Sequence, residues 1–489
     1  MNIADKYKTL VPIHGNKLGL SHDGKLVCPE GIVVGSHRRQ QTLLPRPAGN
    51  QFVKVEPTLR FKPYAADGTQ LFTSSALTNG GTAAVDMERI DVTTGLPMAK
   101  MTLPNTTTGY QSLNYYEMTP WYMDDEDVWL MSVYLPEPPQ ATMLFQILVT
   151  NQNSIAGTEF RTYQFNANRL QQGYNTLAIL NVETAIGSST YGTVGTNAVS
   201  AWTNGGAQTK DSAVVSIRIR GIVTAGAAGD TVMYFGALHT APAGWCTAAI
   251  MWSADDVPIS FYNLALPIIE EFGWPVTFNA SSGLTGNAQG NYISAAQYRA
   301  LIRSGHEVWG HTYLHEALTS LTEAEKTTAL TVSRDFWNAQ GIESAARFLA
   351  YPTGVYDAGT ITVAKSLGYK LATTVTGQCT GTPWVPGVNP FTLGRNSMET
   401  DNSWQADSIL NGIILRGQAT FTYMHDAYAG GKRSDVNPSA DASSFYADHL
   451  RRWCELVKSH EEQGRVVCLT GTEYYKQCGI NPYTHQFTE

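Results

Sequence analysis

The pattern of apolar residues changes near residue 240, and this change constrains the fold more than any other feature of the sequence. Between about residues 51 and 240, short segments alternate apolar and polar side chains, as in residues 215–220, where Val, Ile and Ile alternate with Ser, Arg and Arg. A period of two residues is typical of half-buried strands. Turn residues such as Asn204 and Gly205 separate these segments. The region therefore predicts an antiparallel β-sandwich.

After residue 244, apolar strand-like runs alternate with helical segments that carry recognisable caps. Ser294 and Gln297 have capping-box spacing at the start of a helix over residues 295–303. A second capping box opens a helix over residues 322–341, and a third helix spans residues 360–367. Regular alternation of strand and helix predicts a parallel β/α barrel.

A chain of 489 residues is too long for one hydrophobic core, so we expect three parts. Residues 1–50 form an N-terminal arm or attachment segment, residues 51–242 the β-sandwich, and residues 243–489 the catalytic domain. Aromatic residues around Trp121, Trp129 and Trp202 would make the sandwich a carbohydrate-binding module if their rings are exposed. The alternative is that these rings belong to its core.

Composition excludes several classes of protein. The net charge of -8 argues against a general affinity for nucleic acid or anionic lipid. Six cysteines are spread along the chain without a C-x-x-C pair, which favours buried free thiols over a disulfide framework or a zinc ribbon. The start of the sequence has no apolar segment of signal-peptide length, and no run of about 20 apolar residues occurs, so we expect no signal peptide and no membrane insertion.

The first candidate site is an apolar segment, residues 248–254, that ends in Asp255 and Asp256. Adjacent like charges raise the proton affinity of one carboxylate unless a cation binds one and leaves the other as a base. A solvated acidic turn is the alternative for an isolated Asp-Asp pair.

The second candidate site is the histidine pair His311 and His315. A spacing of four places both imidazoles on one face if the segment is helical, within reach of one metal ion. Two neutral nitrogens and one carboxylate suit Zn²⁺, and Co²⁺ or Ni²⁺ would be accepted by the same ligands. Alone, such a pair is as often structural; beside the acidic pair it predicts a metal site.

The third candidate is His425, which follows another strand-like run, where a β/α barrel collects its active-site groups. Alone it would more often be a structural histidine. It supplies what the other two sites lack, a group able to protonate a departing amine.

Together these segments resemble the polysaccharide deacetylase family, which is also described as NodB-homology or carbohydrate esterase 4. The family's first motif, an Asp-Asp pair that ends a strand, matches Asp255 and Asp256, and its second, H-[ST]-x-x-H, matches residues 311–315. Its last motif, L-x-H, is similar to residues 423–425. The resemblance covers about half the chain and implies a distorted (β/α) barrel of NodB type that removes N- or O-acetyl groups from a polysaccharide.

The resemblance also implies roles for these residues. It makes Asp256, His311 and His315 the metal ligands. It makes Asp255 the base that accepts a proton from water, and His425 the acid that protonates the leaving group. An acetylated polysaccharide is then the partner that we expect.

The family's third motif, R-x-P-[YW]-G, is matched only in part, by Ala350-Tyr351-Pro352-Thr353-Gly354. The resemblance places an oxyanion-binding backbone N–H near Thr353, beside Tyr351 and Pro352. The family's fourth motif is an Asp-Trp element, and only Asp401 and Trp404 of residues 401–404 resemble it, so we interpret that stretch as a surface loop.

Two departures from the family pattern affect the base. Val257 stands where a glycine usually follows the acidic pair, and Ala350 replaces the arginine that holds the base in the family. Another residue must therefore orient Asp255, and Arg395 and Arg347 are the candidates. A binding or adhesion protein with a degenerate deacetylase domain stays open as the second class of function.

The family usually acts on cell-surface or extracellular polymers, yet we expect no signal peptide in this chain. A bacteriophage tail spike reconciles the two, because host lysis releases such proteins and an N-terminal segment attaches them to the virion. That hypothesis predicts a homotrimer that acts on a bacterial surface or capsular polysaccharide.

Overall fold

The computed structural model describes most of the chain between residues 52 and 483. The described residues are 52, 54–65, 67–76, 82–91, 94–104, 109–115, 119–122, 127–137, 143–152, 161–166, 170, 172–180, 201–204, 212–223, 229–286, 291–375, 381–382, 385–386, 389–399, 406–429 and 444–483. In the predicted N-terminal arm, only two antiparallel strand pairs are described: β1 (Gly19–Leu20) with β2 (Leu26–Val27), and β3 (Ile32–Ser36) with β4 (Arg39–Leu43).

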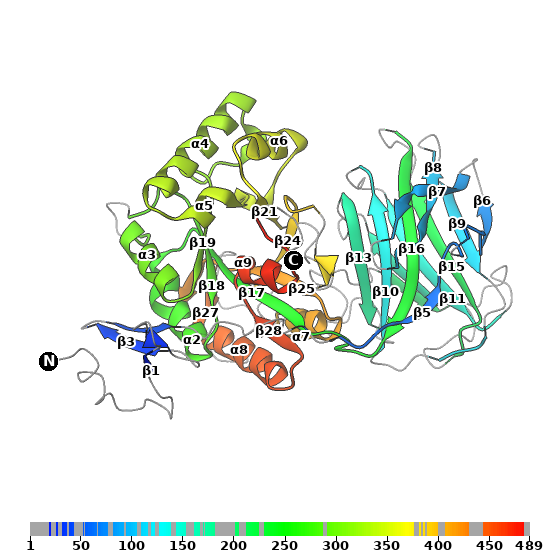
Figure 1. Cartoon of the computed structure of the whole chain (residues 1–489), viewed down its shortest axis with the longest axis horizontal. Helices are drawn as coiled ribbons and strands as arrows, with labels where there is room; N and C mark the ends of the chain where they lie inside the picture. Colours follow the sequence, from blue (N-terminus) through cyan, green and yellow to red (C-terminus); the bar gives the residue numbers. More distant parts are fainter. Residues whose placement is uncertain are drawn as a thin grey trace.

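Two six-stranded antiparallel sheets follow and form a sandwich, on the right in Figure 1. The first sheet has the order β13 (Gly173–Leu180), β10 (Val128–Leu135), β16 (Thr231–Ala241), β8 (Pro97–Leu103), β7 (Thr82–Ile90), with β5 (Thr58–Phe61) paired to β16. The second has the order β14 (Ala201–Asn204), β12 (Arg161–Asn166), β11 (Leu144–Thr150), β15 (Ser216–Val223), β9 (Gly109–Tyr115), β6 (Thr73–Ala76). The predicted antiparallel sandwich is confirmed.

The sandwich core is built from the alternating apolar residues of both sheets. Ile217 and Ile219 of β15 are 1% exposed, and Phe145 of one sheet stacks on Phe235 of the other at 5.2 Å between ring centroids. Trp121 and Trp129 are also buried in this core. They therefore offer no exposed ring to a sugar, while the side chain of Trp202 lies outside the described residues.

The C-terminal half is a closed barrel of parallel strands, as predicted. Its strands are β17 (Ala248–Asp255), β18 (Val276–Ala280), β19 (Glu307–Gly310), β20 (Phe348–Ala350), β21 (Leu371–Thr374), β24 (Leu393–Ser397) and β25 (Ala419–Tyr423). Neighbours pair in this order, and β25 pairs with β17 to close the barrel. Every residue of β17 is buried, which explains its unbroken apolar run.

Other strands extend the barrel sheet at its two ends. β28 (Val466–Cys468) runs parallel to β17, and the hairpin of β22 (Gly381–Thr382) and β23 (Val385–Pro386) joins β25. A separate parallel pair, β26 (Asp426–Tyr428) and β27 (Ser444–Tyr446), follows directly after His425.

Helices cover the outside of the barrel and connect its strands (Figure 1). They are η2 (Phe261–Ala265), α2 (Leu266–Glu271), α3 (Ala295–Arg303), η3 (Leu318–Ser320), α4 (Glu323–Ala339), α5 (Glu343–Arg347), η4 (Pro352–Gly354), α6 (Ala358–Ser366), α7 (Ala406–Leu415), α8 (Ala447–Glu461) and α9 (Gly471–Gln477).

The predicted helix starts are confirmed at two positions and shifted at a third. Ser294 and Thr322 both form complete capping boxes, at α3 and α4. α6 begins at Ala358 instead of residue 360, because the Asp357 carboxylate accepts the N–H of Thr360 and caps the helix two residues earlier.

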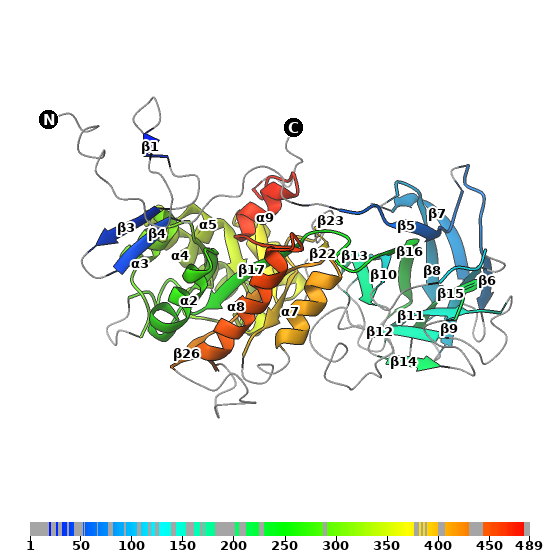
Figure 2. The same ribbon diagram turned by 90° about the horizontal axis from the view of Figure 1, so that it is seen from below.

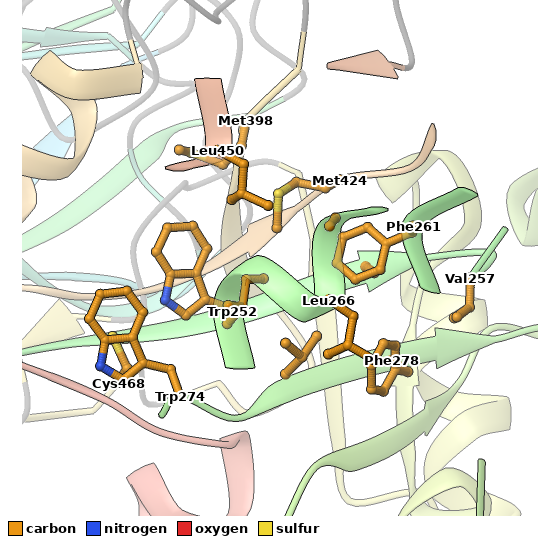
Figure 3. Close-up of a cluster of buried hydrophobic side chains, with 14 of the residues drawn as sticks. Trp252, Val257, Phe261, Leu266, Trp274, Phe278, Met398, Met424, Leu450 and Cys468 are labelled. Carbon is orange, nitrogen blue, oxygen red and sulfur yellow. The ribbon is translucent and has the colours of Figure 1, made fainter. Parts of the chain in front are cut away.

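Among the apolar clusters that stabilise the barrel, two lie on opposite sides of its strands. The outer core lies between strands and helices, where Trp252 stacks on Trp274 at 6.0 Å between ring centroids, beside Cys468 (Figure 3). The inner core fills the barrel and includes Trp309 and Phe421.

Two residues that lie far apart in sequence, one before the sandwich and one near the C-terminus, cover the base of the inner core. Tyr474 of α9 is fully buried there, and Phe52, which precedes the whole sandwich in sequence, packs against it at 6.4 Å between ring centroids. Residue 52 thus belongs to the core of the barrel.

The sandwich meets the barrel at the amino-terminal ends of β17 and β25. Val128, Leu130 and Ala241 of the sandwich cluster with Trp245, whose indole N–H donates to the carbonyl oxygen of Arg416 at 3.0 Å. β13 lies next to the β22–β23 hairpin on the same side (Figure 2). This contact lies at the opposite end of β17 from Asp255.

Two further expectations concern cysteines and membranes. Cys246, Cys454 and Cys468 are buried free thiols and Cys478 is a partly buried one, as predicted, while Cys28 and Cys379 lie outside the described residues. Within the part of the chain that is described, no helix has the length and apolar character needed to cross a membrane.

Candidate active site

The candidate residues gather at the carboxyl-terminal ends of the barrel strands. Asp255 is the last residue of β17, His311 follows β19, the segment 351–354 follows β20, and His425 follows β25. Parallel strands all end on the same face of a barrel, so residues far apart in sequence meet there. The three candidate sites therefore form one site.

Asp256, His311 and His315 come together as a candidate metal-binding group, three residues that could hold one ion. The Asp256 Oδ1 atom lies 3.8 Å from His311 Nε2 and 3.9 Å from His315 Nε2, and all three ligand atoms lie within 4.8 Å of one another. Ligand bonds of about 2.0–2.2 Å allow two atoms on one ion to be up to about 4.4 Å apart. The spacing around Asp256 therefore suits a shared ion.

Two buried polar atoms support the same conclusion. Asp256 Oδ1 and His311 Nε2 are both buried without a hydrogen-bond partner. Such groups are costly to bury unless a partner compensates for the lost water. A cation between them would satisfy both atoms.

The surroundings of His311 favour the neutral form of its ring, which is the form that can bind a metal ion. Its Nδ1–H donates to the carbonyl oxygen of Ala350 at 2.8 Å, which leaves the Nε2 lone pair facing Asp256. Burial lowers the pKa of the His311 ring, so the ring stays uncharged near neutral pH. Ala350 thus contributes to the site through its backbone, although its side chain replaces the family's arginine.

The two histidines do not lie on a helix, which was the premise for bringing them together. Residues 312–314 form a turn that begins with Thr312 at φ 62°, and His315, the residue after the turn, has φ 63°. These left-handed conformations reverse the chain, and the two rings lie 4.9 Å apart. The prediction that the two imidazoles lie close together is therefore confirmed, whereas the helix assumed for it is replaced by a turn.

Asp255 has different partners from Asp256. Arg395 Nη1 on β24 lies 2.6 Å from Asp255 Oδ1 and 2.7 Å from Oδ2, and the amide of Asn279 on β18 donates to Oδ1 at 2.7 Å. Burial by itself raises the pKa of Asp255, but the positive charge of Arg395, and that of His311 and His425 when they are protonated, with the Asn279 hydrogen bond, hold it well below its usual value. The carboxylate is therefore ionised at neutral pH.

Of the two arginine candidates, Arg395 is the one that lies on Asp255. Arg347 ends α5, at the amino-terminal end of β20, where its guanidinium lies beside Gly368. The charge that the third motif lacks at Ala350 is thus supplied from β24, which only β25 separates from β17 in the closed barrel.

His425 pairs with a carboxylate that the sequence did not reveal. Its Nδ1–H donates to Glu399, which lies just after β24 and is 5% exposed. Burial by itself lowers the pKa of His425, but the Glu399 hydrogen bond and the negative charge of Asp255 raise it to about 9. His425 is therefore protonated at neutral pH, and its Nε2 proton is the one left to donate.

The third-motif segment is only partly directed to the site. Tyr351 is fully buried and its hydroxyl donates to the carbonyl oxygen of Phe391, so its side chain is structural. Pro352 is also buried, while Thr353 is exposed with φ 56°. Thr353 is the member of the segment whose backbone remains a candidate oxyanion donor.

Backbone strain is concentrated at this face. Among the described residues, those other than glycine with positive φ are Asp256, Val257, Thr312, His315 and Thr353. Each such conformation costs about 1–3 kcal/mol and persists only where the surroundings impose it. Val257 occupies the position where the family has glycine, and its φ of 52° explains why glycine is favoured there.

Glu399 and Asn279 are the residues that sequence reasoning missed. Asn279 could have been found from strand register, because it pairs with Asp255 across β17 and β18. Glu399 lies two residues before the acidic element at 401–404 that was weighed as a fourth motif, and that element lies outside the described residues.

Residues 247–372 match a family model described as Polysaccharide deacetylase. The matched segment contains the acidic pair, both metal-site histidines and the third-motif segment, and it ends before Arg395. No curated protein is similar enough to match the chain.

Several solved structures resemble parts of the chain. The Streptococcus pyogenes deacetylase PplD, in complex with acetate, is 30% identical over 25% of this chain and 54% of its own, with a TM-score of 0.24. The Xyl-CE4 domain of a multidomain xylanase from the hindgut metagenome of Trinervitermes trinervoides is 16% identical over 49% of this chain and 95% of its own, with a TM-score of 0.33. A family 4 carbohydrate esterase from Streptomyces lividans, in complex with acetate, is 16% identical over 49% and 96%, with a TM-score of 0.32. Over residues 247–372 the chain is therefore similar to polysaccharide deacetylase domains, and this match supports an enzyme.

Proposed function

We propose that the C-terminal half is a metal-dependent hydrolase that removes acetyl groups from a bacterial surface or capsular polysaccharide. The observation that carries the proposal is the pair of unpartnered buried atoms, Asp256 Oδ1 and His311 Nε2, beside a second carboxylate that has its own cation. One acid and two histidines suit Zn²⁺, with Co²⁺ or Ni²⁺ as alternatives, and three protein ligands leave a position open for catalysis.

Asp255 is the proposed general base. A divalent ion held by Asp256, His311 and His315 would polarise the acetyl carbonyl and lower the pKa of water from ~16 to roughly 7. Asp255 accepts one proton as water attacks the acetyl carbon. Its ion pair with Arg395 keeps it ionised and fixes its orientation.

His425 is the proposed general acid. As the bond between the acetyl carbon and the sugar nitrogen breaks, the Nε2 proton of His425 passes to the nitrogen, and the products are acetate and a free amine. Glu399 keeps His425 protonated for this step. The same groups would release acetate from an O-acetyl ester, with the proton passing to oxygen. The backbone N–H of Thr353 is the proposed donor to the oxyanion.

The competing proposal is a carbohydrate-binding protein with a degenerate deacetylase domain, for which the missing third-motif arginine is the main support. The position of Arg395 argues against it, since a cation reaches Asp255 by another route. The burial of Trp121 and Trp129 also removes two of the aromatic residues on which sugar binding by the sandwich was based.

Acetate release tests the proposal directly. The full chain, incubated with acetylated capsular, peptidoglycan and chitin-type polymers, should release acetate; a chelator should abolish release and Zn²⁺ or Co²⁺ should restore it. Asp255→Asn should keep the metal but lose turnover, whereas His311→Ala or His315→Ala should lose the metal. A metal-loaded protein that releases no acetate from any polymer would favour the binding protein.

The place of action and the assembly are proposals that rest on the sequence alone. A virion tail spike attached through residues 1–50 would be a homotrimer, which light scattering measures. A monomer at micromolar concentration would count against it.

A further inference from the structure

Two large apolar side chains are exposed beside the metal-binding group. Tyr313 is 37% exposed and Leu314 is 52% exposed, and both lie in the turn between His311 and His315. Single exposed apolar residues are common on protein surfaces. Two in succession, next to a metal ligand, call for a more specific explanation.

The backbone holds this turn in one conformation. Ser282 N–H donates to the Thr312 carbonyl at 3.2 Å, Gly283 N–H donates to the Tyr313 carbonyl at 2.7 Å, and Leu314 N–H donates to the Glu316 carboxylate at 2.9 Å. The left-handed residues on either side, Thr312 and His315, add strain that is kept only because the surroundings impose it. The two side chains are therefore presented rigidly.

Both side chains pack against Gly283. A Cβ added there would lie 2.8 Å from Leu314 Cδ2, 2.8 Å from Tyr313 Cε2 and 2.8 Å from the Tyr313 carbonyl oxygen. The two side chains thus converge on Gly283 and leave their other faces to solvent. We call Tyr313, Leu314 and Gly283 the apolar platform.

We propose that the apolar platform binds a pyranose ring of the polymer adjacent to the acetylated sugar, and so selects polymeric over small acetylated substrates. The inference rests on the proposed function and deepens it. The C–H groups of a pyranose form an apolar face that fits an aromatic ring and an aliphatic side chain side by side. A platform already held rigid loses little conformational entropy on binding.

Binding to the holoenzyme is measured through competition. 4-Nitrophenyl acetate is too small to reach the platform and reports on the chemistry alone, while penta-N-acetylchitopentaose competes with it and reports on polymer binding. Leu314→Ser and Tyr313→Ala should raise the inhibition constant of the oligosaccharide at least about tenfold. Turnover of the small ester should change by less than about twofold, since neither side chain touches the reacting atoms.

Two further variants sharpen the test. Gly283→Ala should weaken oligosaccharide binding without removing a platform side chain, because its Cβ displaces both. Val332→Ser is the matched control: Val332 is 40% exposed on α4, away from the strand ends, and its loss should leave both measurements unchanged.

An unchanged inhibition constant in Leu314→Ser and Tyr313→Ala would overturn the platform, and so would a parallel loss of ester turnover, which would mean that the turn only supports His315. Saturation-transfer NMR on the chelator-treated full chain separates this inference from the proposed function. Oligosaccharide binding that depends on Leu314, without any acetate release, would support the apolar platform and contradict the deacetylase. Acetate release from the polymer by Leu314→Ser at the wild-type rate would support the deacetylase and contradict the apolar platform.

Discussion

Arg395→Met should destabilise the protein by about 3–5 kcal/mol, because it leaves Asp255 as a buried charge without its cation. Arg395 Nη1 contacts both carboxylate oxygens at 2.6 and 2.7 Å, and the two side chains are only 2% and 5% exposed. Water therefore cannot replace the lost guanidinium. Methionine keeps most of the length of the side chain, so the loss of charge dominates.

The pH dependence of that loss follows from the Asp255 pKa. In the wild type this pKa is depressed, so Asp255 contributes stability above the pKa of the unfolded chain and loses it as pH falls through the folded value. Without Arg395, burial is the largest remaining influence and raises the pKa. The penalty in Arg395→Met should therefore be larger at about pH 8 than at about pH 5.

Urea unfolding at both pH values measures this difference, and a double variant isolates the pair. Arg395→Met combined with Asp255→Asn removes both charges and should recover most of the stability lost in the single variant. Arg347→Met, which removes an arginine that does not contact Asp255, is the control and should cost about 1 kcal/mol or less. A loss below about 1 kcal/mol for Arg395→Met, or an equal loss at both pH values, would refute the reasoning.

Three further outcomes are expected. Activity should fall as pH rises through about 9, where His425 loses its proton, and Glu399→Gln should move this alkaline limb of the pH–rate profile to lower pH, since the carboxylate is what raises the pKa; an unmoved limb would remove Glu399 from that role. Phe52→Ala should lower the free energy of unfolding, measured in urea, by about 3–5 kcal/mol. The control Val55→Ser, at an exposed residue nearby, should lower it by about 0.5 kcal/mol or less. Metal at about a thousand times its dissociation constant should stabilise the full chain by about 4 kcal/mol over the chelated form, and a midpoint that does not depend on metal would contradict the ligand assignment.

The architecture was predictable because it follows from sequence patterns that each involve only a few neighbouring residues. The alternation in β15, the unbroken apolar run of β17 and the capping boxes at Ser294 and Thr322 each depend on residues within a few positions of one another. The candidate metal ligands could be predicted equally well, because Asp256 follows one apolar strand-like run and His311 follows another. The division of the chain at residue 242 stays a prediction.

The surroundings of the base were not predictable, because they depend on strand order and register. Asn279 reaches Asp255 only through the pairing of β17 with β18, and Arg395 reaches it from β24, on the far side of β25. No local pattern distinguishes Arg395 from Arg347, or Glu399 from other acidic residues. The turn at Thr312 was missed for a related reason: left-handed conformations of residues other than glycine are imposed by tertiary structure.

The place of Phe52 bears on the order in which the protein is made. During synthesis residue 52 emerges before any strand of the barrel. The sandwich and the barrel strands are made next, and Tyr474 of α9, against which Phe52 packs, is made only near the end. Until then the nascent barrel has an open apolar base, a surface that chaperones bind and that aggregates when chains are concentrated. Cutting the chain at residue 242 would remove Phe52 and leave its place against Tyr474 empty. An expression design that keeps residues 52–56 in front of the barrel, joined by a short linker, would close the base without the sandwich.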